Sequence, residues 1–236
     1  GFRHERLFTL IRNLQRRRHF ILSTGIGAVV GLCAPLAAAQ APGKAAAAPA
    51  RPPVILVLGD SLSAEYGLAR GTGWVALLEK QLAQEKLSAT VVNASVSGET
   101  TSGGRSRLPA LLAQHQPSHV VIELGGNDAL RGLPLKNTEE NLTFMTQAAQ
   151  KAGAKVLLVG MQVPPNYGTA YANQFAGLFT QVAKAQKVAV VPFFLKGVAD
   201  GPDPTRLFQP DRIHPRAEAH PLMLANVWPE LKKLLR

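Results

Sequence analysis

The stretch Val54-Ile55-Leu56-Val57-Leu58-Gly59-Asp60-Ser61-Leu62 is the part of the sequence that decides the fold. Its first five residues form an uninterrupted apolar run of strand length, as expected of a parallel strand that is buried on both faces. Gly59 ends the run, and two polar residues follow at once. In open α/β sheets, ligands bind beyond the carboxyl ends of the strands, so Asp60 and Ser61 are placed where a functional site would lie.

Short apolar or β-branched runs recur along the chain after this stretch. They predict strands over 54–58, 89–92, 120–124, 156–159 and 188–191. Between them lie longer segments whose apolar residues recur at helical spacing. Alternating strands and helices at these distances indicate right-handed βαβ units. The sequence therefore predicts an α/β fold in three layers, with a parallel sheet of about five strands.

The expected helices are less sharply bounded than the strands. We expect a helix from Trp74 with Thr72 as its cap, a short helix around Leu108–Leu112, a helix capped by Asn137 or Thr138 with Glu140 in a capping box, a helix over 170–187, and a closing helix over 217–235 that is interrupted near Pro221 and Pro229. No internal repeat is found.

The formal net charge of +11 among 236 residues is concentrated at the start of the chain. Residues 1–39 hold six arginines and one acid, and the run Arg16-Arg17-Arg18 precedes an apolar stretch that closes with small residues. This order predicts a secretory signal peptide over 1–39, cleaved after Ala39 or Ala41, and the Sec route is favoured over the twin-arginine route. The stretch is also long enough to be retained as a membrane anchor. A lipoprotein cysteine at Cys33 is disfavoured by the large Leu32 before it.

Residues 40–53 are rich in alanine and proline and predict a linker, so the folded domain is expected over 54–236. Without residues 1–39, the chain has 20 basic and 14 acidic side chains, a charge of +6. Together with the absence of basic and aromatic clusters, this argues against a nucleic-acid partner, although it is compatible with peripheral contact with anionic membranes. The single cysteine excludes a disulfide framework within the chain and multi-cysteine metal sites.

Four polar segments are expected at one edge of the sheet. They are Gly59-Asp60-Ser61-Leu62-Ser63, the loop 93–99, Gly125-Gly126-Asn127-Asp128 and Asp211-Arg212-Ile213-His214. Their residue types suit acyl transfer, because a serine needs a base and an imidazole base needs a partner that fixes its tautomer. Ser61 is the candidate nucleophile, His214 the base and Asp211 its partner. The backbone N–H groups of Ser61 and Gly98 and the amide of Asn127 are candidate oxyanion donors.

Each of these segments alone has a simpler structural explanation. Gly-Asp-Ser after a strand is commonly a capped turn, and paired glycines often serve turns with positive φ. Asp60 and Asp128 are expected to hold their loops in place. The serines 63, 95 and 97 read as turn or cap hydroxyls, and the histidines 115, 119 and 220 as surface or packing residues. The case for catalysis depends on the four segments together.

Other catalytic patterns are missing from the sequence. It has no Gly-x-Ser-x-Gly elbow, no Gly-x-Gly-x-x-Gly after a strand, no complete P-loop and no His-Glu-x-x-His. These patterns mark α/β-hydrolases, nucleotide-binding proteins and zinc proteases, so none of these classes is indicated.

The motif Gly59-Asp60-Ser61-Leu62, with Gly98, Asn127 and the Asp211–His214 pair, resembles the SGNH hydrolase superfamily of GDSL lipases and esterases. The stretches 92–100, 108–117, 123–128 and 165–168 are similar to the branch of acyl-CoA thioesterase I, lysophospholipase L1 and arylesterase. The resemblance covers the chain from about Val54 to its end. Glu65 departs from the pattern, since many members have glycine there.

The resemblance implies a flavodoxin-like monomer that needs no metal or organic cofactor and hydrolyses fatty acyl thioesters, lysophospholipids and aryl or short-chain esters. It assigns nucleophile, base and orienting acid to Ser61, His214 and Asp211, and the oxyanion hole to Ser61, Gly98 and Asn127. It further implies that a mobile segment, 129–135, covers the acyl chain. The substrate-binding residues that it suggests are Leu130, Leu133, Met161, Pro164 and Tyr167. The alternatives are an SGNH carbohydrate acetyl esterase and a non-catalytic envelope binding module.

Overall fold

The computed structural model describes residues 52–236. The predicted signal peptide, 1–39, and all but the last two residues of the predicted linker, 40–53, lie outside the described residues. Within residues 52–236, no helix is both long and apolar enough to cross a membrane.

A five-stranded, all-parallel sheet forms the centre of the domain. Its strands are β1 (Val54–Gly59), β2 (Thr90–Asn93), β3 (His119–Glu123), β4 (Lys155–Val159) and β5 (Ala189–Val191), in the order β2-β1-β3-β4-β5. Leu56 on β1 lies opposite Val92 on β2 and Val120 on β3. The predicted α/β fold with a five-stranded parallel sheet is confirmed, and the strand order is that of flavodoxin-like proteins.

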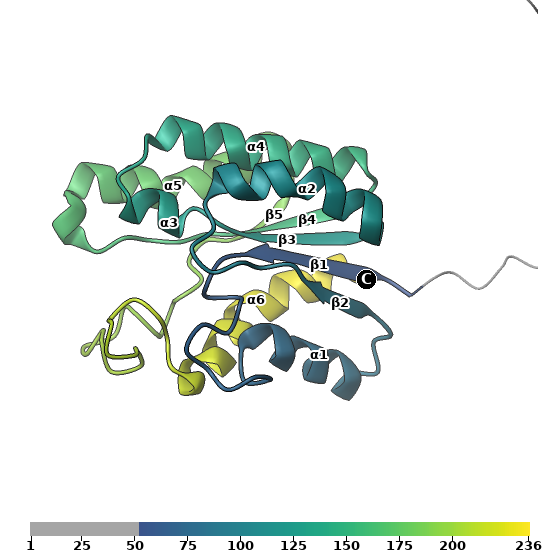
Figure 1. Cartoon of the computed structure of the whole chain (residues 1–236), viewed down its shortest axis with the longest axis horizontal. Coiled ribbons are helices and arrows are strands. Elements are labelled where there is room, and N and C mark those ends of the chain that lie inside the picture. The colour runs from purple at the N-terminus through teal and green to yellow at the C-terminus, as the bar shows by residue number, and fades with distance from the viewer. Residues whose placement is uncertain (1–51) are drawn as a thin grey trace, which may run out of the picture. The chain divides into compact units, whose positions relative to one another are not determined.

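Helices cover both faces of the sheet, as Figure 1 shows, with α1 and α6 on one side and α2, α3, α4 and α5 on the other. Their bounds are α1 (Trp74–Gln84), α2 (Thr101–His115), α3 (Gly126–Leu130), α4 (Leu135–Lys151), α5 (Thr169–Gln186) and α6 (His220–Leu234), with short 3₁₀ helices η1 (Pro165–Tyr167) and η2 (Ala217–Ala219). Strands β1 and β3 are buried almost throughout. Large side chains such as Trp74, Phe175 and Phe194 fill the space between the sheet and its helices. This core holds the ends of β1 and β3 rigidly in place.

Two predicted helix caps are wrong. Helix α1 begins after Gly73, and Thr72 instead donates its hydroxyl to the carbonyl of Ala69 (2.6 Å). Helix α4 begins after Pro134, which places Asn137 and Thr138 inside the helix. The hydroxyl of Thr138 donates to the Asp128 carboxylate (3.3 Å), so a tertiary contact replaces the expected capping box.

Three helical segments differ from the sequence-based expectation. Helix α2 is 15 residues long and includes Gly103, Gly104 and Pro109, all of which disfavour helix. A Cβ on Gly104 would lie 2.3 Å from the Leu124 side chain, so this glycine allows α2 to approach the sheet closely. Helix α3 occupies the start of the segment that was expected to be a loop over 129–135. In α6, Pro221 stands in the first turn and Pro229 does not interrupt the helix.

Candidate active site

The four polar segments meet at the carboxyl ends of β1, β2 and β3. Ser61 begins a turn over 61–67 directly after β1, Gly98 precedes α2, and Asn127 stands in α3 after β3. The fourth segment, 211–214, comes from the long connection between β5 and α6. The convergence that topology predicted is therefore present in the structure.

Ser61, His214 and Asp211 form one continuous hydrogen-bonded chain. The Nε2 atom of His214 lies 2.9 Å from the Oγ of Ser61, although 153 residues separate them in the sequence. On the other side of the ring, Nδ1 lies 2.6 Å from the Oδ2 of Asp211. Because a carboxylate only accepts hydrogen bonds, Nδ1 carries the proton of the neutral ring and Nε2 is left as an acceptor for the serine hydroxyl.

Asp211 remains charged in this arrangement. Partial burial opposes its charge, but hydrogen bonds from the His214 ring and from the backbone N–H groups of His214 and Ile213 outweigh that effect and lower the pKa to about 2. A lowered pKa means that the carboxylate stabilises the folded site above about pH 4 and loses this contribution as the pH falls toward 2. At neutral pH the ring of His214 is therefore oriented by a full negative charge.

The loop that carries Asp211 and His214 is tied to the nucleophile turn. Gln209 donates its backbone N–H to the carbonyl of His214 (2.7 Å) and its side-chain amide to the carbonyl of Tyr66 (2.9 Å). The ring of Tyr66 packs against the imidazole of His214 with 4.3 Å between centroids. Bridging of Phe208 to Pro215 closes the loop at its base. These contacts restrict the imidazole to the side of the loop that faces Ser61.

Two backbone N–H groups are available beside the nucleophile. Among the described residues, neither the N–H of Ser61 nor that of Gly98 donates to any acceptor. Gly98 has a φ of 79°, a conformation that favours glycine, and is exposed. Arg131 donates to the Gly98 carbonyl (2.9 Å) and so fixes the orientation of that peptide. Both N–H groups can therefore donate a hydrogen bond to an oxygen atom on which negative charge develops.

The side-chain amide of Asn127 is oriented by two acceptors. Its Nδ2 donates to the Oδ2 of Asp60 (3.0 Å) and to the carbonyl of Glu99 (3.0 Å), which settles which end of the amide is nitrogen. Both of its protons are already bonded, so an oxyanion at this position would have to share or replace one of these acceptors.

The two aspartates that were expected to hold loops do so. Asp60 accepts the N–H of Leu62 (3.0 Å) as well as the Asn127 amide. Asp128 is buried and accepts both the backbone N–H (2.9 Å) and the hydroxyl of Thr101 at the start of α2. Asp128 thus ties the loop that contains Gly98 to the helix that contains Asn127.

A further buried carboxyl, Glu123, lies next to Asp60 and was missed by the sequence analysis. It is 2% exposed at the end of β3 and accepts the hydroxyl of Ser63 (2.7 Å), which in turn accepts the indole N–H of Trp74 (3.0 Å). Ser63 is thus a buried linker and not the predicted turn or cap hydroxyl. The only signal in the sequence was one acid at the end of an otherwise apolar strand.

Burial raises the pKa of Asp60 to about 6 and that of Glu123 well above its usual range, where the charge of Asp60 raises it further. A buried acid with a raised pKa favours the folded state below its ordinary pKa and loses that contribution as the pH rises. Two charges this close together in the core would repel each other, which is why the charge of Asp60 adds to the rise in the pKa of Glu123.

Glu123→Gln should therefore stabilise the fold at pH 8 but not at pH 4. In the unfolded chain, Glu123 ionises above about pH 4.5, which favours unfolding of the wild-type protein, whereas glutamine has no such dependence. We expect the melting temperature of the variant to exceed that of the wild type by several degrees at pH 8, with the difference vanishing near pH 4. A difference independent of pH would show that Glu123 is ionised in the folded protein.

The residues suggested for substrate binding lie on two segments at the same edge of the sheet. Leu130 and Leu133 follow Asn127 and are 40% and 36% exposed, and Tyr167 after β4 is 39% exposed. Pro164 is exposed on this second segment, whereas Met161 is 7% exposed and belongs to the core. Tyr66, Val96 and Ile213 add further exposed apolar side chains beside His214 and Gly98. Six of the eight large exposed apolar side chains of the described domain thus lie on segments at this edge of the sheet.

The other histidines take structural positions. The ring of His119 contacts the carbonyl of Leu234 (2.9 Å), and burial lowers its pKa. His220 is buried and accepts the backbone N–H of Trp74 (3.0 Å), and burial lowers its pKa to about 4. Both rings are therefore neutral packing groups at pH 7.

Glu65 stands where the family resemblance leads us to expect glycine. Its φ is 58°, in the region that favours glycine, and its carboxylate accepts the N–H of Gly71 (2.9 Å) and of Gly73 (2.8 Å) at the start of α1. The strain of this conformation is thus offset by a side chain that caps the helix.

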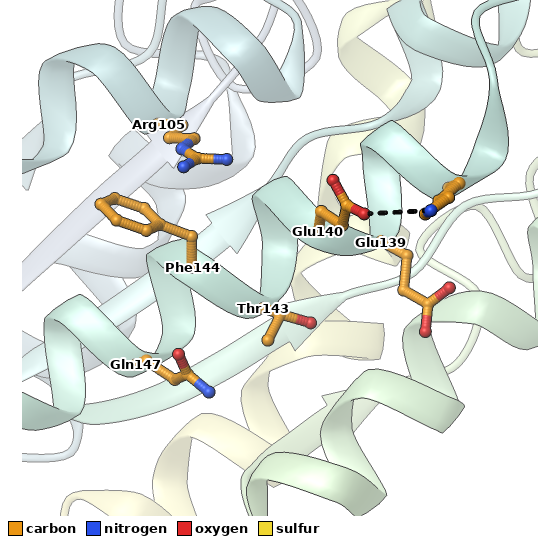
Figure 2. Close-up of a pocket in the computed structure, with 7 residues that line it drawn as sticks. Arg105, Glu139, Glu140, Thr143, Phe144 and Gln147 are labelled. Carbon is orange, nitrogen blue, oxygen red and sulfur yellow. Dashed lines mark ion pairs between the residues drawn. The ribbon is translucent and has the colours of Figure 1, made fainter.

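A surface depression lies away from these residues, on the outer side of α2 and α4 (Figure 2). There the Arg105 guanidinium packs 4.3 Å from the centroid of the Phe144 ring, and Lys136 pairs with Glu140. Its lining contains none of Ser61, His214 and Asp211. The candidate catalytic residues therefore lie at the sheet edge and not in this depression.

The sequence matches known proteins over most of the described domain. Residues 57–222 match the GDSL-like Lipase/Acylhydrolase family. The chain is 53% identical over 181 residues to Esterase TesA of Pseudomonas aeruginosa, covering 77% of this chain and 89% of that protein. It is 42% identical to the Arylesterase of Vibrio mimicus, with the same coverage. It is also 42% identical to Thioesterase 1/protease 1/lysophospholipase L1 of Escherichia coli K12, covering 77% of this chain and 84% of that protein.

Solved structures agree with this assignment. The crystal structure of TesA superimposes with a TM-score of 0.74 at 52% identity, covering 77% of this chain and 99% of that one. The psychrotrophic esterase EstA from Pseudoalteromonas, inhibited by monoethylphosphonate, gives a TM-score of 0.72 at 42% identity, covering 77% and 98%. From its motifs, its fold and these relatives, the chain belongs to the GDSL-like lipase/acylhydrolase family and is a hydrolase of the SGNH type.

Proposed function

We propose that this protein is an exported serine hydrolase that cleaves acyl esters and thioesters through a covalent acyl-Ser61 intermediate. The observation that carries the proposal is the chain from Asp211 through His214 to Ser61, with distances of 2.6 and 2.9 Å. It is the arrangement that an otherwise unreactive hydroxyl needs in order to attack a carbonyl carbon.

In the first half of the reaction, Nε2 of His214 takes the proton of the Ser61 hydroxyl while Oγ bonds to the carbonyl carbon of the substrate. The charge of Asp211 stabilises the imidazolium that forms. His214 then gives its proton to the leaving alcohol or thiol as the carbon–oxygen or carbon–sulfur bond breaks. In the second half, a water molecule is the nucleophile in place of Ser61. Its attack on the acyl carbon breaks the bond to Oγ, which releases the carboxylic acid and restores the Ser61 hydroxyl.

We propose that the N–H groups of Ser61 and Gly98 and the amide of Asn127 donate hydrogen bonds to the carbonyl oxygen and stabilise its negative charge. Removing one such donor costs about 3–4 kcal/mol of transition-state stabilisation in comparable enzymes. The two backbone groups have no acceptor among residues 52–236, which supports this role. Asn127 would join them by sharing a proton that it now gives to Asp60 or Glu99.

The names of the relatives and the apolar rim support an acyl group as the recognised part of the substrate. The relatives are an esterase, an arylesterase and a thioesterase/lysophospholipase. Leu130, Leu133 and Tyr167 expose apolar surface at the same edge of the sheet as Ser61, and we propose that an acyl chain covers it. We further propose that the enzyme acts as a monomer and contacts membranes only peripherally.

Purified domain should prefer longer acyl chains to acetyl. Each buried methylene contributes about 0.8 kcal/mol, so kcat/KM for aryl esters should rise severalfold per added methylene until the apolar rim is covered. A chain-length series of aryl esters and acyl-CoA thioesters measures this. A preference for acetylated glycans, with no gain from longer chains, would instead favour a carbohydrate acetyl esterase.

Export is proposed from residues 1–39, whose arginines precede an apolar stretch. Expression of the full chain in a Gram-negative host should yield periplasmic protein whose N-terminus begins at Gln40 or Pro42. Intact-mass analysis of the periplasmic fraction tests this. Protein that keeps its first 39 residues and stays in the membrane fraction would indicate a retained anchor.

A further inference from the structure

The Asp60 carboxylate is the point where the nucleophile turn, the Asn127 amide and the core meet. Its Oδ1 accepts the N–H of Leu62, next to Ser61, and its Oδ2 accepts the Asn127 amide, both at 3.0 Å. The backbone N–H of Asp60 lies 3.4 Å from the Oε2 of Glu123, which brings the two buried carboxyl groups next to each other. Asp60 is 3% exposed, so protein groups and not bulk water donate hydrogen bonds to its carboxylate.

Two adjacent buried carboxyl groups can hydrogen-bond to each other only if one of them carries a proton. Asp60 is an acceptor in its other contacts, so the proton between the two carboxyl groups has to come from Glu123. The Oε2 of Glu123 accepts from Ser63 and, more weakly, from the backbone N–H of Asp60 (3.4 Å). Two ionised carboxylates at this depth would repel each other strongly.

We propose that Glu123 is a positioning residue for catalysis, which as a neutral acid holds the Asp60 carboxylate in the place where it orients the Asn127 amide and the Ser61 turn. This rests on the proposed function, because the amide matters only if an oxyanion forms beside it. Glu123 itself touches neither the substrate nor Ser61.

The charges around the pair are consistent with this role. Glu123 faces Asp60 from β3, and His214 is the other ionisable group that acts on Asp60. On the core side, the partners of Glu123 among residues 52–236 are neutral: the Ser63 hydroxyl and, through it, the indole of Trp74. Without the Glu123 proton, Asp60 would lose a donor and would be free to move away from Asn127.

The test compares Glu123→Gln with Glu123→Leu in aryl-ester hydrolysis. Glutamine keeps both a donor for Asp60 and an acceptor for Ser63, so its kcat and KM should stay within about threefold of wild type. Leucine removes the donor, and kcat should fall about 10- to 100-fold with little change in KM, as expected when a transition-state donor is displaced. Thr146→Val, which removes a buried hydroxyl of α4 outside the site, is the control for loss of stability alone.

Equal losses in the glutamine and leucine variants would overturn the proposal, because they would show that the negative charge of Glu123 is what matters. An unchanged kcat in Glu123→Leu would overturn it as well. If the leucine variant does not fold, Asp60→Asn takes its place. Both oxygens of Asp60 accept hydrogen bonds, one from Leu62 and one from Asn127. An asparagine has an NH₂ group in place of one of these oxygens, so it loses one of the two bonds. Full activity of Asp60→Asn would then contradict the proposal. Fluorophosphonate labelling of Ser61 in the wild type separates these outcomes from a failure of the serine mechanism itself.

Discussion

Ser61→Ala is expected to lower kcat for an aryl acyl ester by about a millionfold while leaving the fold intact. In serine hydrolases built on the same triad, removing the nucleophile costs about as much as removing all three members, because the three act as a unit. Here the hydroxyl of Ser61 is the group to which Nε2 of His214 points at 2.9 Å. Steady-state hydrolysis at saturating substrate measures the loss.

The fold of this variant should be unaffected, since Ser61 is half-buried and its hydroxyl bonds only to His214 among the described side chains. A melting temperature within a few degrees of wild type is the control. Turnover at an unchanged rate in the well-folded variant would rule out Ser61 as the nucleophile.

His214→Ala is expected to be nearly as damaging, with kcat reduced by about 10⁴- to 10⁶-fold. Without the imidazole, no group takes the serine proton, and the charge of Asp211 has nothing to orient. His115→Ala is the matched control, because His115 stands at the end of α2, at the opposite end of that helix from Gly98. It should leave kcat and KM unchanged. Equal losses in the two variants would mean that the base has been assigned wrongly.

The sheet and the site were predictable because they depend on patterns that are local in sequence. The apolar run at Val54–Leu58 marks β1 without help from the rest of the chain, and the polar residues after it define the edge of the sheet. Topology then brings His214 to Ser61 across 153 positions. The observed strand order agrees with short, right-handed connections, but these rules do not by themselves determine it.

Features that depend on tertiary contacts were not predictable. Helix α2 contains Gly104 and Pro109 against helix propensity, because Gly104 allows the helix to pack closely on Leu124. The predicted helix caps were wrong for a similar reason. The N–H of Gly73 at the start of α1 donates to Glu65 and not to Thr72, and the hydroxyl of Thr138 donates to Asp128. Glu123 was not predicted as a site residue because a single acid at the end of a strand belongs to no motif. Its role depends on tertiary contacts with Asp60 and Ser63.

The covalent intermediate can be tested most directly by mass spectrometry of the wild-type protein after treatment with a fluorophosphonate. The Oγ of Ser61 should displace fluoride and add one phosphonyl group, with a parallel loss of activity. We expect one adduct per chain, on the peptide that contains Gly59-Asp60-Ser61-Leu62, and none in Ser61→Ala or His214→Ala. An adduct on a different residue, or complete loss of activity without any adduct at Ser61, would contradict an acyl-serine mechanism.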